Sequence, residues 1–361
     1  MRSGHTDWLE ALSPWPADGF GLGRMRALLA RLGDPQLEFP SVHVVGTNGK
    51  STTTRTIEET LSVERLRTGG YYSPHVTGWA ERIRIGGQEA DLEGAIDRVR
   101  PAAEEVGATQ FEVLTAAALA GFAEAAVDVA AVEAGLGGRF DATNVLRSPV
   151  QVLTNVALEH TQVLGDTREA IAEEKLAVVQ PGATVVLGEP EWEGLARRNG
   201  AARVIVESGG NRALAGAAVS AFLGRPVEPA AVSLPGRLEW RRGEIWDGAH
   251  TPEAVRYLAA TLPRLGAILA SILEDKDVDG MLRLLAERSD VLVATQSSHP
   301  RALAADELAA RAYARFARVE VVPHPGEALC RARELAGGAG TLLVTGSLYL
   351  LADLHATGEK T

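Results

Sequence analysis

The sequence predicts an α/β protein of two domains, each built on a mostly parallel sheet. Short apolar runs alternate with longer amphipathic or alanine-rich runs along the whole chain, a pattern typical of strand–helix–strand units. The 361 residues exceed the length at which one core stops growing, and 46% of them are hydrophobic, enough to fill two cores. Pro226, Pro229 and Pro235 punctuate the chain between two series of elements. We therefore expect domains over residues 1–230 and 235–361.

The first domain is predicted from a series of short apolar strands. Residues 127–132 and 150–153 are the clearest of them, and residues 184–187 and 203–206 are shorter candidates. The long, alanine-rich segment 111–126 predicts a buried helix that leads into the strand after it.

A second series of elements follows the prolines. It consists of five expected strands and two expected helices, and it predicts a smaller, Rossmann-like α/β domain. The strands are expected at residues 244–246, 267–273, 291–295, 319–322 and 341–345, and the helices at residues 252–260 and 281–287.

Composition narrows the possible partners. The net charge of −11 offers no basic field, so we expect no nucleic-acid partner. The single cysteine, Cys330, excludes an internal disulfide framework. The sequence has no apolar stretch of about 18 residues and no basic segment before an apolar core at its N-terminus. These features predict a cytoplasmic protein without a membrane partner.

The segment HVVGTNGKST, residues 43–52, predicts a strand that opens onto an anion-binding loop. Residues 52–61 have the composition of a helix, whose first N–H groups would face an anion. Lys50 supplies a mobile cation, and Ser51 offers a hydroxyl to Mg²⁺. The phosphate-loop pattern is imperfect because its first glycine falls at Val44, so a plain strand–turn–helix remains the alternative.

Two more polar groups follow expected strands of the first domain. Glu133 comes directly after the strand at 127–132 and precedes the glycine-rich segment 134–139. His160 follows the next strand within a few residues. Carboxyl ends of parallel strands share one edge of a sheet, so Glu133, His160 and Ser51 could close around one Mg²⁺. Imidazole is an unusual magnesium ligand, and a flexible loop and an ordinary histidine are the alternatives.

Two other motifs have plain alternatives when they are considered alone. Lys175 lies among acidic residues on an expected helix, which is typical of a surface lysine. Asp247 ends a strand and is followed by a glycine turn and His250. Asp247 could accept hydrogen bonds from ribose and His250 could face a phosphate, although an Asp-Gly turn explains the same residues.

Taken together and in this order, the motifs resemble the folylpolyglutamate synthase/dihydrofolate synthase family of the Mur ligase superfamily. The resemblance covers nearly the whole chain. Its strings SPH at residues 73–75 and GLGGRFDATN at residues 135–144 are typical of folate ligases and not of cell-wall ligases. The other matching segments are residues 46–51, 81–84, 111–115, 159–161, 174–175, 235–237, 247–250 and 275–277.

The resemblance implies an ATP-dependent ligase that adds L-glutamate to folate or dihydropteroate through an acyl phosphate. It implies ATP as co-substrate, two Mg²⁺ ions, a carbamylated lysine at position 175 and a monomer. The implied catalytic residues are Lys50, His160 and Lys175. The implied ATP-binding residues are Gly46, Thr47, Asn48, Gly49, Lys50, Ser51, Thr52, Asn211, Arg237, Asp247 and His250. The implied metal ligands are Ser51, Glu133, His160 and Lys175, and the implied substrate contacts are Tyr72, Ser73, His75 and Phe111.

Some residues depart from the family pattern. Ser51 stands where the family commonly has glycine, so Thr52 is a rival metal ligand. Glu159 replaces an aspartate, and Thr251 replaces an asparagine. Two other functions stay open: a Mur-type ligase for a cell-wall precursor, and a nucleotide-binding switch without ligase activity. A switch would need neither a second metal site nor a second nucleotide-facing domain.

Overall fold

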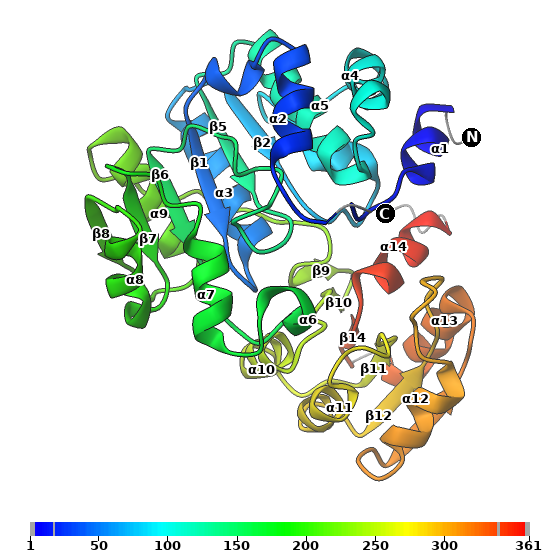
Figure 1. Ribbon diagram of the computed structural model, residues 1–361. Helices are drawn as coiled ribbons and strands as arrows, with labels where there is room; N and C mark the ends of the chain where they lie inside the picture. The colour runs from blue at the N-terminus through cyan, green and yellow to red at the C-terminus, as the bar shows by residue number, and fades with distance from the viewer. Residues whose placement is uncertain (1–3, 17–18, 338–339, 358–361) are drawn as a thin grey trace. The chain divides into compact units, whose positions relative to one another are not determined.

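The computed structural model describes residues 4–16, 19–337 and 340–357, and it divides the chain into two compact units (Figure 1). The boundary falls between Val232 and Ser233. Residues 76–78 are an exception, because they group with the second unit. Each unit contains one mixed sheet in which parallel pairs dominate, so the predicted α/β fold class is confirmed.

The first unit is built on an eight-stranded sheet in the order β4-β3-β2-β5-β1-β6-β7-β8. The strands from β2 to β8 along this order are parallel, while β3 and β4 add an antiparallel edge. The strands are β1 (Ser41–Val45), β2 (Thr68–Tyr71), β3 (Ile83–Ile85), β4 (Gln88–Glu89), β5 (Val129–Glu133), β6 (Val150–Leu153), β7 (Thr184–Leu187) and β8 (Arg203–Val206).

Helices cover both faces of this sheet. The α-helices are α1 (Gly4–Ala11), α2 (Gly23–Arg31), α3 (Lys50–Val63), α4 (Leu92–Val106), α5 (Gln110–Glu124), α6 (Thr161–Leu164), α7 (Arg168–Leu176), α8 (Glu193–Arg198) and α9 (Asn211–Leu223). Three short 3₁₀ turns, η1 (Pro35–Leu37), η2 (Trp79–Arg82) and η3 (Pro190–Trp192), complete the described elements of this unit.

Strand alternation decides which helices cover which face. In β5, Ala130 and Val132 pack in the core that α2, α4 and α5 share, while Val129 and Ala131 pack under α3 and α9. The central strand β1 is buried along its whole length, between β5 and β6. A strand buried on both faces brings whatever follows it to a well-supported edge of the sheet. The loop after β1 lies there.

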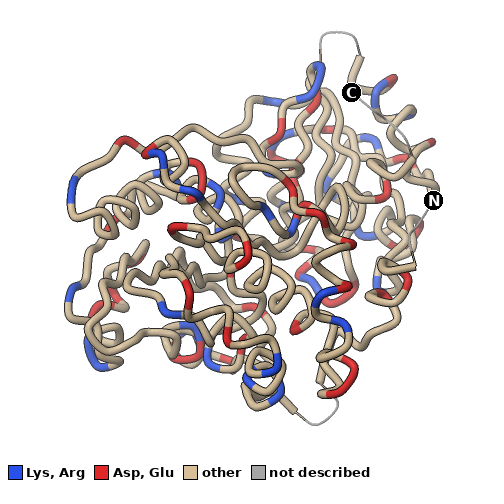
Figure 2. The backbone as a smooth tube through the Cα atoms, turned by 90° about the horizontal axis from the view of Figure 1, so that it is seen from above, with Lys and Arg blue, Asp and Glu red and all other residues tan. Residues whose placement is uncertain are grey.

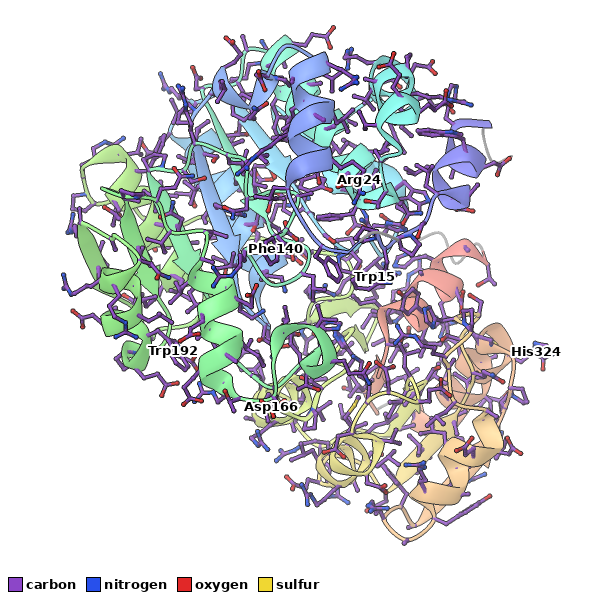
Figure 3. The ribbon with its side chains drawn as sticks, in the orientation of Figure 1. Trp15, Arg24, Phe140, Asp166, Trp192 and His324 are labelled. Atoms are coloured by element: carbon purple, nitrogen blue, oxygen red, sulfur yellow. The ribbon has the colours of Figure 1, made fainter. Side chains whose placement is uncertain are left out.

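The start of α5 is fixed by side chains. Thr109 caps the helix and forms a reciprocal capping box with Glu112. The Arg24 guanidinium of α2 donates to the same Glu112 carboxylate at 2.8 Å, and both side chains are largely buried. Figure 3 labels Arg24. The first turn of α5, which contains Phe111, is therefore tied to the rest of the unit.

The second unit has a six-stranded sheet in the order β13-β12-β11-β14-β10-β9. All its pairs are parallel except β10 with β9. The strands are β9 (Glu239–Arg241), β10 (Glu244–Trp246), β11 (Ala267–Ala270), β12 (Val291–Ala294), β13 (Arg318–Val321) and β14 (Leu342–Thr345). The helices are α10 (Pro252–Thr261), α11 (Val278–Ala286), α12 (Ala305–Ala312), α13 (Pro325–Ala336) and α14 (Leu348–Ala356).

Most predicted elements occur with small shifts in their ends. The expected strand at 267–273 stops at Ala270, because the chain turns out of the sheet before the apolar run ends. The sequence pattern did not predict β2, whose two central glycines carry no strand signal. Basic and acidic residues are interspersed along the backbone (Figure 2). No helix within the described ranges is long and apolar enough to span a membrane.

Candidate active site

The phosphate loop lies between β1 and α3, as the sequence predicts. Gly46 begins it at φ +149°, and a Cβ there would lie 1.8 Å from Thr154 Oγ1, so only glycine fits. Gly49 is the N-cap of α3 in the left-handed region, at φ 81°. Lys50, half-buried, is the first helical residue, and its Nζ donates to the carbonyl of Thr47 at 3.1 Å. The loop thus presents a helix N-terminus and a lysine together.

Residues at the end of the neighbouring strand β6 hold this loop. The side chain of Asn155 accepts from Asn48 N at 3.0 Å and donates to Asn48 O at 2.9 Å. Thr154 Oγ1 donates to the same carbonyl at 2.7 Å. Thr47 N donates to the carbonyl of Asn155 at 2.9 Å. These bonds predefine the loop's shape, and the sequence pattern gave Thr154 and Asn155 no role.

Glu133, the last residue of β5, is the buried carboxylate beside the loop. It is only 1% exposed. Its Oε1 accepts from the Ser51 hydroxyl at 3.0 Å, and its Oε2 accepts from the Ser73 backbone N–H at 3.1 Å. Ser51 is itself buried, while Thr52 is half-buried on the next helical position. The structure therefore brings two of the predicted site residues, Ser51 and Ser73, to Glu133.

Lys175 of α7 is buried, in contrast to the surface position that its acidic neighbours suggested. It is 1% exposed, and its Nζ donates to Gly46 O at 2.8 Å and to Glu159 Oε1 at 2.9 Å. Burial, with Lys50 nearby, lowers the pKa of Lys175 to about 8 against the opposing effect of Glu159. The two lysines hold the pKa of Glu159 down at about 2, despite its burial. Lys175 thus contacts the phosphate loop directly.

His160 stands between β6 and α6. It caps α6 in the left-handed region, with φ 46° and ψ 40°, and its side chain is exposed. It follows Glu159 and contributes to the lowered pKa of that carboxylate. His160 follows β6, which is parallel to β1 and β5 in the same sheet, and its meeting with Glu133 at one metal stays a prediction.

The glycine-rich segment after Glu133 is folded around Asp141. This buried carboxylate accepts from the N–H groups of Gly135 and Leu136 at 2.9 and 2.8 Å, and from the Thr143 N–H at 3.0 Å. Burial raises the pKa of Asp141. The Thr143 hydroxyl lies 2.8 Å from His43 Nε2 in β1. The segment is therefore ordered by a buried polar chain that the sequence pattern did not reveal.

The predicted substrate contacts fall into two groups. Phe111 packs against the glycine-rich segment, since a Cβ on Gly135 would lie 2.5 Å from Phe111 Cζ. His75 is half-buried, accepts from Arg82 Nε at 2.9 Å and packs against Trp79 with tilted rings whose centroids are 4.4 Å apart. Burial and Arg82 lower the pKa of His75 to about 3, so it is neutral.

Tyr72 belongs to a different environment. It is 3% exposed, and its hydroxyl donates to Glu58 of α3. The Arg55 guanidinium lies over its ring at 5.3 Å from the centroid. Tyr72 is thus the predicted substrate contact that lies deepest inside the unit.

Within the second unit, the three predicted nucleotide contacts lie together. Asp247 accepts from Leu238 N at 2.7 Å and from Ala249 N at 2.8 Å, and burial raises its pKa. His250 Nδ1 lies 2.8 Å from the carbonyl of Gly248. A Cβ on Gly248 would lie 3.2 Å from Arg237 Nη1, which places the guanidinium beside the same turn.

Asn211 also reaches the phosphate loop. It is the first residue of α9, and a Cβ on Gly49 would lie 2.3 Å from its Oδ1. The N-termini of α3 and α9 are therefore side by side in the first unit. Nothing in the residues flanking Asn211 indicated this, because the contact depends on how the two helices pack.

Comparison with known proteins defines the class of the chain. Residues 44–207 match the Mur ligase middle domain, and residues 236–348 match the Mur ligase glutamate ligase domain. Together with the phosphate loop, they define an ATP-dependent acid–amino-acid ligase of the Mur type.

Relatives define the family. The dihydrofolate synthase/folylpolyglutamate synthase of Mycobacterium tuberculosis is 33% identical over 84% of this chain and 80% of its own length. The structure of M. tuberculosis folylpolyglutamate synthase complexed with ADP matches with TM-score 0.90 at 29% identity, over 99% of this chain and 98% of the other. The structure of a bifunctional folylpolyglutamate synthase/dihydrofolate synthase with Mn, AMPPNP and L-glutamate bound matches with TM-score 0.85 at 30% identity, over 98% of this chain and 96% of the other. The chain belongs to the dihydrofolate synthase/folylpolyglutamate synthase family.

Proposed function

We propose that the protein joins L-glutamate to the carboxylate of a folate or of dihydropteroate, with ATP as the energy source. The proposal rests on a cluster at one edge of the first sheet. Its members are the phosphate loop, Glu133 and Lys175. The named activities of the relatives support folate substrates over a cell-wall precursor. A nucleotide switch would not need the buried Lys175.

The chemistry needs a leaving group on a carboxylate. The substrate carboxylate attacks the γ-phosphate of ATP to give an acyl phosphate and ADP, and the amine of glutamate then displaces phosphate to form the amide. Catalysis consists mainly of positioning and of charge neutralisation. In our proposal Lys50 and the N–H groups of residues 46–52 hold the phosphates, with Lys50 neutralising charge that develops during transfer.

The donors beside the loop fit a divalent cation. Glu133 is a buried carboxylate with a serine hydroxyl at 3.0 Å, and hard oxygen donors are what Mg²⁺ takes. No three histidine, cysteine or acidic side chains form a metal cluster by themselves in the described ranges, so the proposed set needs serine oxygen and nucleotide phosphate as well. When bound, the ion would neutralise phosphate charge. We propose Glu133, His160 and Ser51 as its ligands, with Thr52, half-buried on the next helical position, as the rival to Ser51.

We also propose that Lys175 is carbamylated in the active protein. A neutral amine adds CO₂ to form a carbamate and releases one proton. Its burial and the pKa of about 8 favour the neutral amine more than an exposed lysine would. The carbamate would place an anion beside Glu159, a pair that a second Mg²⁺ would stabilise. A mass increase of one CO₂ on Lys175, checked by ¹³CO₂ labelling and NMR, would test this modification.

The remaining site residues have roles that follow from their positions. We assign Asn211 to the adenosine side of the nucleotide, because it lies beside Gly49. Arg237, Asp247 and His250 would supply nucleotide contacts from a second domain over residues 235–361, which would also face glutamate. The domain over residues 1–230 would hold ATP and the folate. We assign Phe111, Ser73 and His75 to the folate side, as the sequence predicts. The sequence also predicts Tyr72 there, but the Tyr72 hydroxyl is bound to Glu58 on α3.

One assay tests the function. Purified protein is mixed with ATP, Mg²⁺, L-glutamate and either dihydropteroate or tetrahydrofolate, and phosphate release and product mass are measured. We expect phosphate release that requires both the pteridine and glutamate. Release without a pteridine, or with a cell-wall precursor only, would reject the proposal. We further propose that the protein acts as a monomer in the cytoplasm, where ATP and glutamate are supplied, without a nucleic-acid or membrane partner.

A further inference from the structure

The residues of β2 alternate between the two faces of the first sheet. One of these faces adjoins Phe111, a residue that we assign to the folate side. Gly69 and Tyr71 face α5. A Cβ on Gly69 would lie 2.8 Å from the Phe122 ring, and Tyr71 Oη lies 3.1 Å from Thr115 Oγ1. The Tyr71 ring centroid is 6.0 Å from that of Phe111. The α5 face of β2 is therefore the one that adjoins Phe111.

Gly70 and Tyr72 face α3 instead. A Cβ on Gly70 would lie 2.7 Å from Tyr72 Oη and 2.8 Å from the Glu58 carboxyl carbon, so the glycine makes room for this contact. Glu58 is fully buried and pairs with Arg55 at 2.9 Å and with Arg84 at 3.2 Å. The Tyr72 hydroxyl donates to the same carboxylate. A buried polar network thus joins the end of β2 to the middle of α3.

This network connects the two segments that contact Glu133 in the proposed metal site, α3 and the end of β2. α3 begins at the phosphate loop and carries Ser51, which donates to Glu133 Oε1. Ser73 follows Tyr72 directly and donates its N–H to Glu133 Oε2. Both oxygens of one carboxylate are therefore held, one from α3 and one from the end of β2. The Tyr72–Glu58 bond fixes the distance between the two donors, the Ser51 hydroxyl and the Ser73 N–H.

We propose that Tyr72 is a positioning residue that sets the orientation of Glu133, and that it does not contact the substrate. The proposal refines the metal site of the proposed function and rests on that function. Tyr72 points to the α3 face, opposite to the face that adjoins Phe111, so a ligand stacked on Phe111 does not reach it. Its role is to hold the backbone of Ser73 through a bond to α3.

The test compares Tyr72→Phe with Tyr71→Phe. The two residues are consecutive, both hydroxyls are buried and hydrogen-bonded, and they lie on opposite faces. Isothermal titration measures the affinity for AMPPNP with Mg²⁺ and with EDTA, and kinetics give the KM for dihydropteroate. For Tyr72→Phe we expect the Mg²⁺-dependent affinity to fall by about fivefold, with unchanged affinity in EDTA and an unchanged KM for dihydropteroate. Tyr71→Phe should leave the Mg²⁺-dependent affinity unchanged.

Two results would overturn the proposal. One is a raised KM for dihydropteroate in Tyr72→Phe with intact Mg²⁺-dependent affinity, which would make Tyr72 a substrate contact. The other is wild-type behaviour of Tyr72→Phe in both measurements. Gly70→Ala keeps the hydroxyl but displaces it, so it should reproduce the loss if Tyr72→Phe does not fold. The binding measurements need no turnover, so a wild-type protein without folate ligase activity would reject the proposed function alone.

Discussion

The charged residues of the first unit's site are far more buried than one charged pair that follows β11 in the second unit. In the first unit Glu133 and Lys175 are each 1% exposed and contact the phosphate loop or its helix. In the second unit Asp275 is 37% exposed and its partner Arg301 is 51% exposed. Buried charges depend strongly on their partners, whereas exposed pairs are screened by water. Substitutions at the first edge should therefore change function and stability far more than substitutions of exposed pairs in the second unit.

Lys175→Ala should have the largest effect. If the buried lysine carries a carbamate that helps to hold a second Mg²⁺, its removal should lower kcat about a thousandfold, because the phosphate charge would then be less well neutralised. Steady-state phosphate release measures the loss, and added short carboxylates should partly restore the rate. Arg197→Ala is a matched control on a nearby helix, because its pair with Glu193 is exposed. A wild-type rate in Lys175→Ala would contradict the carbamate proposal. It would also contradict the expected difference between buried and exposed charges.

His43 makes the first unit sensitive to acid. Burial lowers its pKa from 6.5 to about 4, so between these pH values the unfolded state holds a proton that the folded state lacks. This difference alone should lower the free energy of unfolding by about 3 kcal/mol as the pH falls from 6.5 to 4. Hydrogen exchange in β1 and in β11 measures the two units separately.

His43→Asn should flatten that dependence in β1 and leave β11 unchanged. The asparagine can keep a bond to Thr143, the partner of His43 at 2.8 Å. A smaller slope should remain below pH 6.5, because the pKa of His75 is also low, at about 3. An equal slope in wild type and variant would show that His43 does not control the acid sensitivity.

Gly46→Ala and Gly248→Ala compare a tight turn of the first unit with a tight turn of the second unit. The added Cβ would meet Thr154 Oγ1 at 1.8 Å on a backbone at φ +149°, so the loop must move, and we expect ATP affinity to fall about thirtyfold. Gly248→Ala would meet the Leu348 side chain at 2.1 Å, which can rotate away. Its cost should be mainly in stability, about 1–2 kcal/mol. Nucleotide titration and thermal unfolding distinguish the two, and equal losses of affinity would contradict the contrast.

Sequence patterns predicted the features of the fold and site that depend on neighbouring residues in the chain. The phosphate loop, the strands at 150–153, 184–187 and 203–206 and the placement of Glu133 at a strand end all follow from residue types and periodicity. The burial of Lys175 could not be predicted locally, since its neighbours in the chain are acidic and its partners, Gly46 and Glu159, come from other elements. Only the family resemblance indicated a role for it.

The face of the sheet that Tyr72 occupies could not be predicted from the sequence either. The resemblance places Tyr72 on the substrate side, because the motif is read as a continuous string. Strand alternation separates Tyr72 from Tyr71 onto opposite faces, and β2 itself was not predicted because Gly69 and Gly70 weaken its signal. A side chain's face is fixed by the strand that carries it, so an unrecognised strand leaves that face unassigned.

The smallest effect is expected at an exposed pair of the second unit. Arg264 and Asp290 lie together with side chains that are 64% and 65% exposed. Water screens the pair, and ordering two exposed side chains costs entropy, so Arg264→Gln should change the free energy of unfolding by about 0.5 kcal/mol or less. Urea unfolding at low and high salt measures it, and the small difference should vanish at high salt. A loss comparable to that of the buried first-unit residues would mean that exposure does not separate the two units.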